Sequence, residues 1–245
     1  MAEKKDLAIQ GEKRISGITS DKKSPVTPAG FEGMEEGDLK IARLGVAQGL
    51  SEVCINGKAK MGQLFNNISQ EVYGDSVEII PLFMFKTRAQ FETEKGLVMM
   101  SRDNIKVTMA KEGYEKYLDK PVEEVPGAAW NGEEPPTFGI VYNIPVLISG
   151  VPFPLSLSLM KTATKVAKTF LSMASYSGED MFARVYKVGF SIEKGKKGTF
   201  AVPTIEFVRR CTDQEYANAK LVFDKLYRQK ASIDVQLEEE TEEQK

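Results

Sequence analysis

Hydrophobic and polar residues alternate along much of the chain from residue 38 onward, and this two-residue period predicts β-strands. The clearest alternation is in PFPLSLSLM (152–160), where two kinds of side chain fall on opposite faces: Phe153, Leu155, Leu157 and Leu159 against Ser156 and Ser158. β-Branched and aromatic residues between turn-forming residues extend the pattern. We predict strands over 39–46, 76–92, 96–101, 104–110, 138–150 and 152–160, and a hairpin over 181–207 that turns at KGKKG.

Two segments have a helical period instead. In the first, residues 161–178, one face is apolar and the opposite face is basic: Ala163, Val166, Ala167, Phe170 and Ala174 against Lys161, Lys165 and Lys168. The second, residues 212–230, begins with Thr212 and Glu215 at the spacing of a capping box. Its predicted buried stripe is Tyr216, Ala219, Phe223, Leu226 and Tyr227.

Many short strands, two helices and no strand–helix–strand alternation predict a mainly β protein of the α+β class. A helix inserted late between the strands favours an elaborated, OB-fold-like antiparallel barrel. We expect a flexible N-terminal arm over 1–37, one domain over 38–230 and a disordered acidic tail over 231–245. Inside the domain, the proline- and glycine-rich stretch 111–137 predicts a short helical turn followed by a loop.

The formal net charge of −2 hides an uneven distribution. Asp234 and five glutamates against Lys245 give residues 231–245 a charge of −5, which leaves +3 on residues 1–230. The body of the chain is therefore mildly basic and its end is acidic.

The chain contains no histidine, the commonest general base and a frequent zinc ligand. This excludes Ser-His-Asp and Cys-His nucleophile systems, and no phosphate-binding or dinucleotide-binding glycine motif is present. Cys54 and Cys211 lie far apart and match no disulfide or metal spacing. We therefore expect a binding protein that is not an enzyme and uses neither a metal nor another cofactor.

No apolar run approaches the roughly 20 residues that span a bilayer. The first residues, MAEKKDLAIQ, also lack the apolar segment of a secretory signal. We expect a cytoplasmic protein without a membrane partner.

Cationic and aromatic residues are interleaved on the predicted strands. Single-stranded nucleic acid is held by cations that follow its phosphates and by rings that stack on its bases. The candidate nucleic-acid-binding residues on strands and loops are Phe85, Lys86, Arg88, Trp130, Tyr142, Arg184, Tyr186 and Lys187. To these we add the hairpin lysines Lys194, Lys196 and Lys197, and the helix lysines Lys161, Lys165 and Lys168. The alternative for each ring is burial in the core, and for the hairpin a plain soluble turn.

The chain closes with QLEEETEEQK (236–245), which has five glutamates: Glu238, Glu239, Glu240, Glu242 and Glu243. Such a segment is either a solubilising tail or an imitation of the phosphate backbone that competes for a basic groove on its own protein. In the second case, bound nucleic acid would displace the tail and make it available to a partner protein.

This arrangement of a basic, aromatic β-body, a C-terminal helix and a glutamate-rich tail resembles phage-encoded single-stranded DNA-binding proteins. The stretch KIARLGVAQGLSEVCINGKAKMGQLFNNISQEVYGDSVEIIPLFMFKTRAQF (40–91) also resembles phage proteins of replication gene clusters. The resemblance implies an OB-fold that binds single strands without sequence preference and a tail that recruits polymerase, primase or helicase. The chain departs from some members in having no Cys/His zinc cluster, and from many in having no terminal aromatic residue.

The hypothesis these observations favour is a non-enzymatic single-stranded DNA-binding protein of phage-type replication or recombination. One alternative is a structural or assembly protein of a phage particle that does not bind nucleic acid. Another is a magnesium-dependent nuclease, which would need clustered carboxylates on strands that are here poor in Asp and Glu.

Overall fold

The computed structural model describes residues 40–92, 95–130, 132, 135–195, 198–228 and 234–235. Over these residues the chain is mainly β with three α-helices, and the predicted α+β class is confirmed. The predicted arm (1–37) lies outside the described residues, as do Lys196, Lys197 and all of the predicted tail except Asp234–Val235.

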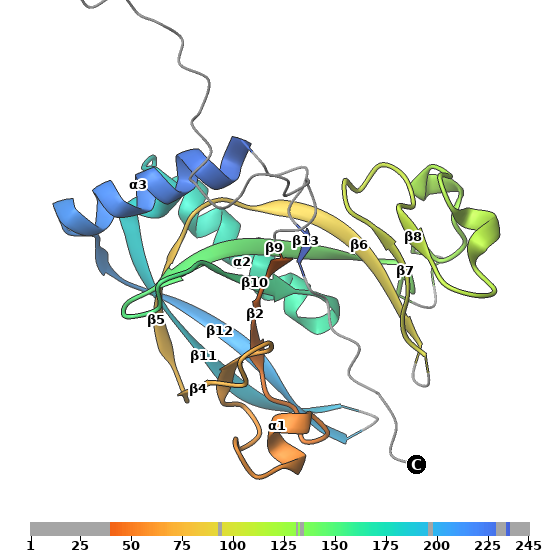
Figure 1. Cartoon of the computed structure of the whole chain (residues 1–245), viewed down its shortest axis with the longest axis horizontal. Helices are drawn as coiled ribbons and strands as arrows, with labels where there is room; N and C mark the ends of the chain where they lie inside the picture. The colour runs from red at the N-terminus through yellow and green to blue at the C-terminus, as the bar shows by residue number, and fades with distance from the viewer. Residues whose placement is uncertain are drawn as a thin grey trace, which may run out of the picture. The chain divides into compact units, whose positions relative to one another are not determined.

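An eleven-stranded mixed sheet forms the centre of the fold (Figure 1). Its main path is β12 (Gly198–Arg210), β11 (Arg184–Gly195), β5 (Val77–Pro81), β9 (Gly139–Ile148), β10 (Leu155–Leu159), β2 (Arg43–Val46), β3 (Leu64–Asn66) and β4 (Val72–Gly74). A branch from β9 adds β6 (Phe85–Glu92), β7 (Gly96–Ser101) and β8 (Met109–Ala110). Separately, β1 (Lys40–Ile41) pairs in parallel with β13 (Asp234–Val235).

The sheet is open, whereas the sequence predicted an antiparallel barrel. The strand β2 runs parallel to β10, with Leu44 opposite Leu157, and lies between β10 and β3, so the main path runs from β12 at one edge to β4 at the other. Gln48, two residues after β2, bridges the remaining gap. Its Nε2 donates to the carbonyl of Ala201 in β12, and its Oε1 accepts from the Ala201 N–H, both at 3.0 Å. A side-chain amide thus replaces the pairing of a closing strand.

The single strand predicted over 76–92 is in fact two strands. Both β5 and β6 pair with the same edge of β9, β5 through Pro81 opposite Val146 and β6 through Phe85 opposite Asn143. Residues 82–84 form the step between them, next to a proline that has no N–H to continue the ladder. The strand predicted over 104–110 is reduced to β8.

The two predicted helices are present, each slightly shorter than predicted. α2 (Thr164–Tyr176) follows a 3₁₀ turn, η3 (Lys161–Ala163), and α3 (Asp213–Arg228) follows β12. The capping box of α3 is confirmed, because the Thr212 N–H donates to Glu215 Oε2 at 2.8 Å and the Glu215 N–H donates back to Thr212 Oγ1 at 3.3 Å. The remaining turns of helix are α1 (Glu52–Ile55), η1 (Glu115–Tyr117), η2 (Val122–Glu124) and η4 (Met181–Ala183).

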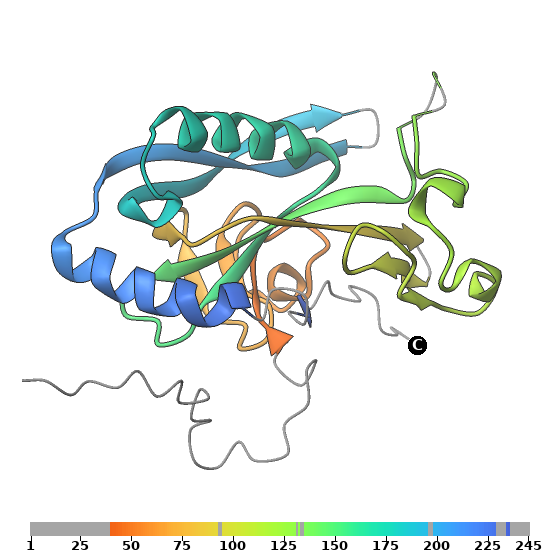
Figure 2. The same cartoon turned by 90° about the horizontal axis from the view of Figure 1, so that it is seen from above.

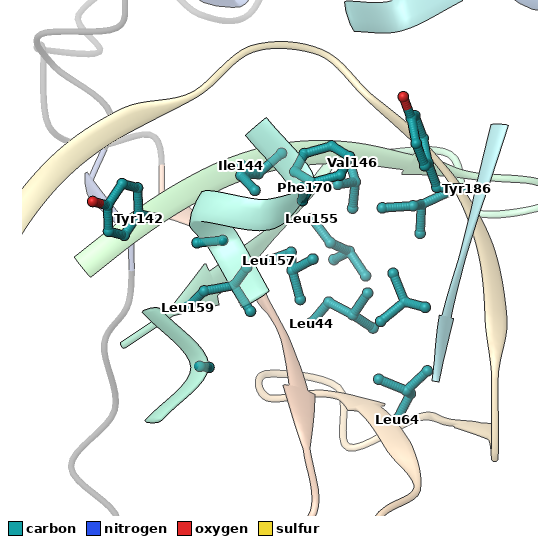
Figure 3. Close-up of a cluster of buried hydrophobic side chains, with 14 of the residues drawn as sticks. Leu44, Leu64, Tyr142, Ile144, Val146, Leu155, Leu157, Leu159, Phe170 and Tyr186 are labelled. Atoms are coloured by element: carbon teal, nitrogen blue, oxygen red, sulfur yellow. The ribbon is translucent and has the colours of Figure 1, made fainter. Parts of the chain in front are cut away.

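The two long helices cover opposite faces of the sheet (Figure 2). Under α2 lies the first core, in which Leu155, Leu157 and Leu159 pack beneath Phe170, as predicted from their alternation (Figure 3). The Phe170 ring meets the Tyr186 ring edge-on at 5.0 Å. Under α3 lies the second core, which contains a chain of three aromatic rings: Phe223 lies 6.0 Å from Phe83 and 5.0 Å from Phe182.

The serine face of β10 is also buried and makes a polar contact network across three strands. Ser158 Oγ donates to Asn143 Oδ1 at 2.8 Å, and Asn143 Nδ2 donates to Thr87 Oγ1 at 2.9 Å. Asn143 is fully buried, and these bonds satisfy both ends of its amide.

Candidate nucleic-acid interface

The structure divides the predicted cations into those held by other residues and those exposed to solvent. Arg88 belongs to the first group. Its Nε donates to Asn104 Oδ1 at 2.8 Å, and its Nη1 donates to the carbonyl oxygens of Ala128 at 2.7 Å and Phe138 at 3.2 Å. The guanidinium thus fastens the long loop between β8 and β9 to strand β6, and its donors face protein acceptors.

Arg184 is held in a similar way. Its Nε donates to Glu179 Oε2 at 2.7 Å, and its guanidinium carbon lies 5.1 Å from the centre of the Phe207 ring. Arg210 pairs with the other oxygen of the same carboxylate at 2.6 Å. The hydrogen bond from Arg184 lowers the pKa of Glu179, so the carboxylate between the two arginines is charged near neutral pH.

The predicted strand aromatics are mostly in the cores. Tyr142 and Tyr186 are 5% and 1% exposed, and Phe85 is half-buried with its ring 6.0 Å from that of Phe83. Trp130 is 61% exposed, as a stacking residue requires. The ring that the sequence analysis missed is Tyr176, which is 89% exposed at the end of α2.

The outer face of α2 is the clearest candidate surface. Lys161, Lys165 and Lys168 are all exposed, and none forms an ion pair with another described residue. The segment Lys161–Tyr176 contains no acidic residue. Tyr176 follows Lys165 by eleven residues, three helical turns, so it lies on the same stripe. That spacing was the available signal for Tyr176.

The register of the sheet brings Lys86 to the beginning of this stripe. Lys86 lies opposite Tyr142 on β9, and Tyr142 lies opposite Leu159 on β10, two residues before Lys161. The ammonium of Lys86 lies 5.5 Å from the centre of the Tyr142 ring. The register thus places Lys86 two strands away from Leu159, which precedes Lys161 by two residues.

Lys161 itself has an unusual backbone. Its φ is +52°, a left-handed conformation that costs a residue with a side chain roughly 1–2 kcal/mol. Its ammonium lies 5.6 Å from the centre of the Phe91 ring, a cation–π contact that helps to fix the side chain.

The hairpin β11–β12 lies beside the same helix, because η3 and α2 both pack against β12. Its Lys194 is exposed, whereas Lys196 and Lys197 lie outside the described residues. Lys187 is also exposed, but it stands between Glu78 on β5 and Glu206 on β12 in the register, which offset its charge. The tail glutamates Glu238, Glu239, Glu240, Glu242 and Glu243 lie outside the described residues.

Other chemistry finds little support in the part of the chain that the structure describes. No group of three or more acidic or cysteine side chains there is placed to hold a metal ion. Burial raises the pKa of the Cys211 thiol to about 11, so it is protonated near neutral pH. None of the described helices is both long and apolar enough to cross a membrane.

The fold is therefore a mainly β, open sheet that carries an exposed basic helix. The chain belongs to the Pam3 phage gp34-like protein family, whose model matches residues 12–232. Comparisons with curated proteins and with solved structures gave no significant match.

Proposed function

We propose that this phage protein binds single-stranded DNA without sequence preference and is not an enzyme. It acts in phage DNA replication or recombination in the cytoplasm of the host cell. The observation that carries the proposal is the acid-free outer face of α2, where three lysines without described ion-pair partners lead to the exposed ring of Tyr176.

Each part of this face matches one part of a single strand. Exposed lysines neutralise phosphates and release counterions, which gives affinity without sequence preference. An exposed tyrosine stacks on any base, because every base has a π-face, and a stack contributes roughly 1–3 kcal/mol. Lys86 at one end of the stripe, and Lys194 on the adjacent hairpin, continue the basic surface.

The tail fits the same proposal as a competitor for this face and as the site that recruits replication proteins such as polymerase, primase or helicase. The pairing of β13 with β1 holds the chain at Val235. Ile41 of β1 and Met160, the residue before Lys161, belong to the same core. From this anchor the remaining ten residues reach at most about 35 Å, enough to bring glutamates to the lysines.

The test is a fluorescence titration of labelled oligo-dT at several salt concentrations. Replacing Lys161, Lys165 and Lys168 by alanine should reduce the slope of log K against log salt by about 2, at about 0.7 per lost phosphate contact. The matched control removes Lys95, Lys220 and Lys225, three lysines outside the stripe, and should leave the slope unchanged. Tyr176→Ala should weaken binding by roughly 1–3 kcal/mol, and Tyr176→Phe should retain it.

Changing the five tail glutamates to glutamine leaves β13 in place and should tighten binding while it weakens partner recruitment. No binding of oligo-dT by the wild type at low salt would overturn the proposal. The alternative, a phage structural or assembly protein, would then be favoured, and its sign would be a defined homo-oligomer in sedimentation.

A further inference from the structure

We infer that the loop 56–63, between α1 and β3, is a second contact for the single strand, opposite the tip of the β11–β12 hairpin. Its Lys58 and Lys60 would bind phosphates there. The inference rests on the proposed function and adds a site that the sequence pattern of strands and helices did not indicate.

The loop is held beside the hairpin in two ways. The first is indirect: Gln63 of the loop accepts from the Ala47 N–H at 2.8 Å, and the neighbouring Gln48 forms two hydrogen bonds with the backbone of Ala201. The second is Gly62, which lies so close to Phe190 of β11 that a Cβ atom on it would stand 2.1 Å from the ring. Gly62 has φ +97° and donates to the Ala47 carbonyl at 2.7 Å. Only glycine permits both this backbone and this contact, so the loop is fixed beside the hairpin.

Basic side chains are present on both sides of this junction, on the hairpin strand and on the loop. The register puts Ala201 opposite Ile192, and Lys194 lies two residues further toward the tip, about 7 Å along the strand. Lys58 and Lys60 are exposed on the loop. Lys58 Nζ donates to the neutral amide of Gln70, and neither lysine forms an ion pair with a described residue. Of the nearby acids, Glu193 points to the opposite face of β11 from Lys194, Glu52 accepts from Asn56 at 3.3 Å, and Asp75 accepts from Gln63 of the loop at 3.1 Å.

The residues that precede the loop, and strand β11 of the hairpin, also carry exposed apolar side chains. Leu50 is 88% exposed, Ile55 57% and Ile192 47%. A surface that combines cations with exposed apolar groups suits a single strand, whose unpaired bases have apolar faces, better than a duplex, which keeps its bases stacked inside. The ligand class is therefore single-stranded nucleic acid.

The test uses the full chain and labelled oligo-dT. At about 0.7 per lost phosphate contact, the K58A/K60A variant should lower the slope of log K against log salt by about 1.4. Its loss of affinity relative to the wild type should therefore be about 25-fold greater at 0.1 M salt than at 1 M salt. The matched control is K220A/K225A, which removes two exposed lysines from α3 and should bind as the wild type does. Gln48→Ala changes no charge but loosens the loop, and should also weaken binding.

The outcomes separate the two proposals. If the wild type binds and K58A/K60A behaves as K220A/K225A does, the loop contact is wrong and the α2 face stands. If the wild type does not bind, both are wrong. Equal competition by duplex and oligo-dT would contradict the assignment to single strands. Because both lysines are exposed, their variants should unfold at the wild-type temperature, and a thermal melt checks that the fold is intact.

Discussion

The helices α2 and α3 cover the two faces of one sheet, yet their outer surfaces use charge in opposite ways. On α2, lysines stand on a segment without carboxylates. Beside α3, Arg209 donates to both oxygens of Glu215, at 2.7 and 2.8 Å, and Glu215 also closes the capping box. The charges of Arg209 and Glu215 are thus satisfied within the fold. Of the lysines on η3 and α2, Lys161 has a cation–π contact with Phe91, and all three are exposed and available to a ligand.

The inner face of α2 is more deeply buried than that of α3, and substitutions on these faces should have the largest effects on stability. Phe170 of α2 is 1% exposed, and its ring packs against the ring of Tyr186. Phe170→Ala should therefore lower the free energy of unfolding by about 3–5 kcal/mol. Phe223 of α3 is only half-buried, so Phe223→Ala should cost less, about 2 kcal/mol. Urea denaturation of both variants measures the difference. Equal losses would mean that α3 is as deeply packed as α2.

The ion pair beside α3 should make stability depend on acid. Hydrogen bonds from Arg209 lower the pKa of Glu215 to about 2, from an ordinary value of 4.5. Because the folded-state pKa is depressed, this stabilisation is present above about pH 4.5 and is lost as pH falls toward 2. Glu215→Gln keeps a capping side chain and should cost about 1 kcal/mol at pH 7.

The wild type and Glu215→Gln should therefore converge in stability as pH is lowered from 5 to 2. Thermal melts across this range provide the measurement. A difference in stability that stays constant with pH would show that the ion pair between Arg209 and Glu215 contributes nothing.

Replacement of Lys161 should have the smallest effect on stability but a clear effect on the binding of DNA. Lys161→Gly removes the strain of its left-handed backbone but also the cation–π contact with Phe91. These terms oppose each other, so the unfolding free energy should change by less than about 1 kcal/mol. Binding of oligo-dT should nevertheless weaken, because one phosphate contact is lost. Unchanged binding would remove Lys161 from the proposed face.

The local sequence pattern predicted burial correctly where apolar residues recurred with a single period, that of a strand or that of a helix. The alternation in 152–160 predicted the faces of β10, and the helical period predicted that Phe170 and Ala174 of α2 are buried. Short-range chemistry was equally reliable at the Thr212–Glu215 cap. These features depend on residues within a few positions of one another, so no tertiary contact was needed to predict them.

Individual site residues were harder to predict, because a strand gives each side chain one of two faces without showing which face is covered. Tyr142 and Tyr186 lie on the covered face, whereas Lys86 in the same row reaches solvent. The sequence pattern predicted Arg88 and Arg184 to be surface cations. In the structure Arg88 donates to acceptors 16 to 50 residues away, and Arg184 donates to Glu179. The structure reassigns both arginines to holding the fold together.

By itself, the sequence determined the mainly β α+β class, the two long helices and the lysine stripe, because each is written in a local period. Only the tertiary structure decided that the sheet stays open. In the open sheet β2 pairs in parallel beside β10, and a side chain, Gln48, in place of a strand pairing links the end of β2 to Ala201 of β12, 153 residues away. Pairings at such separations depend on which edges and faces are left uncovered once the core has formed, and no local pattern encodes that competition.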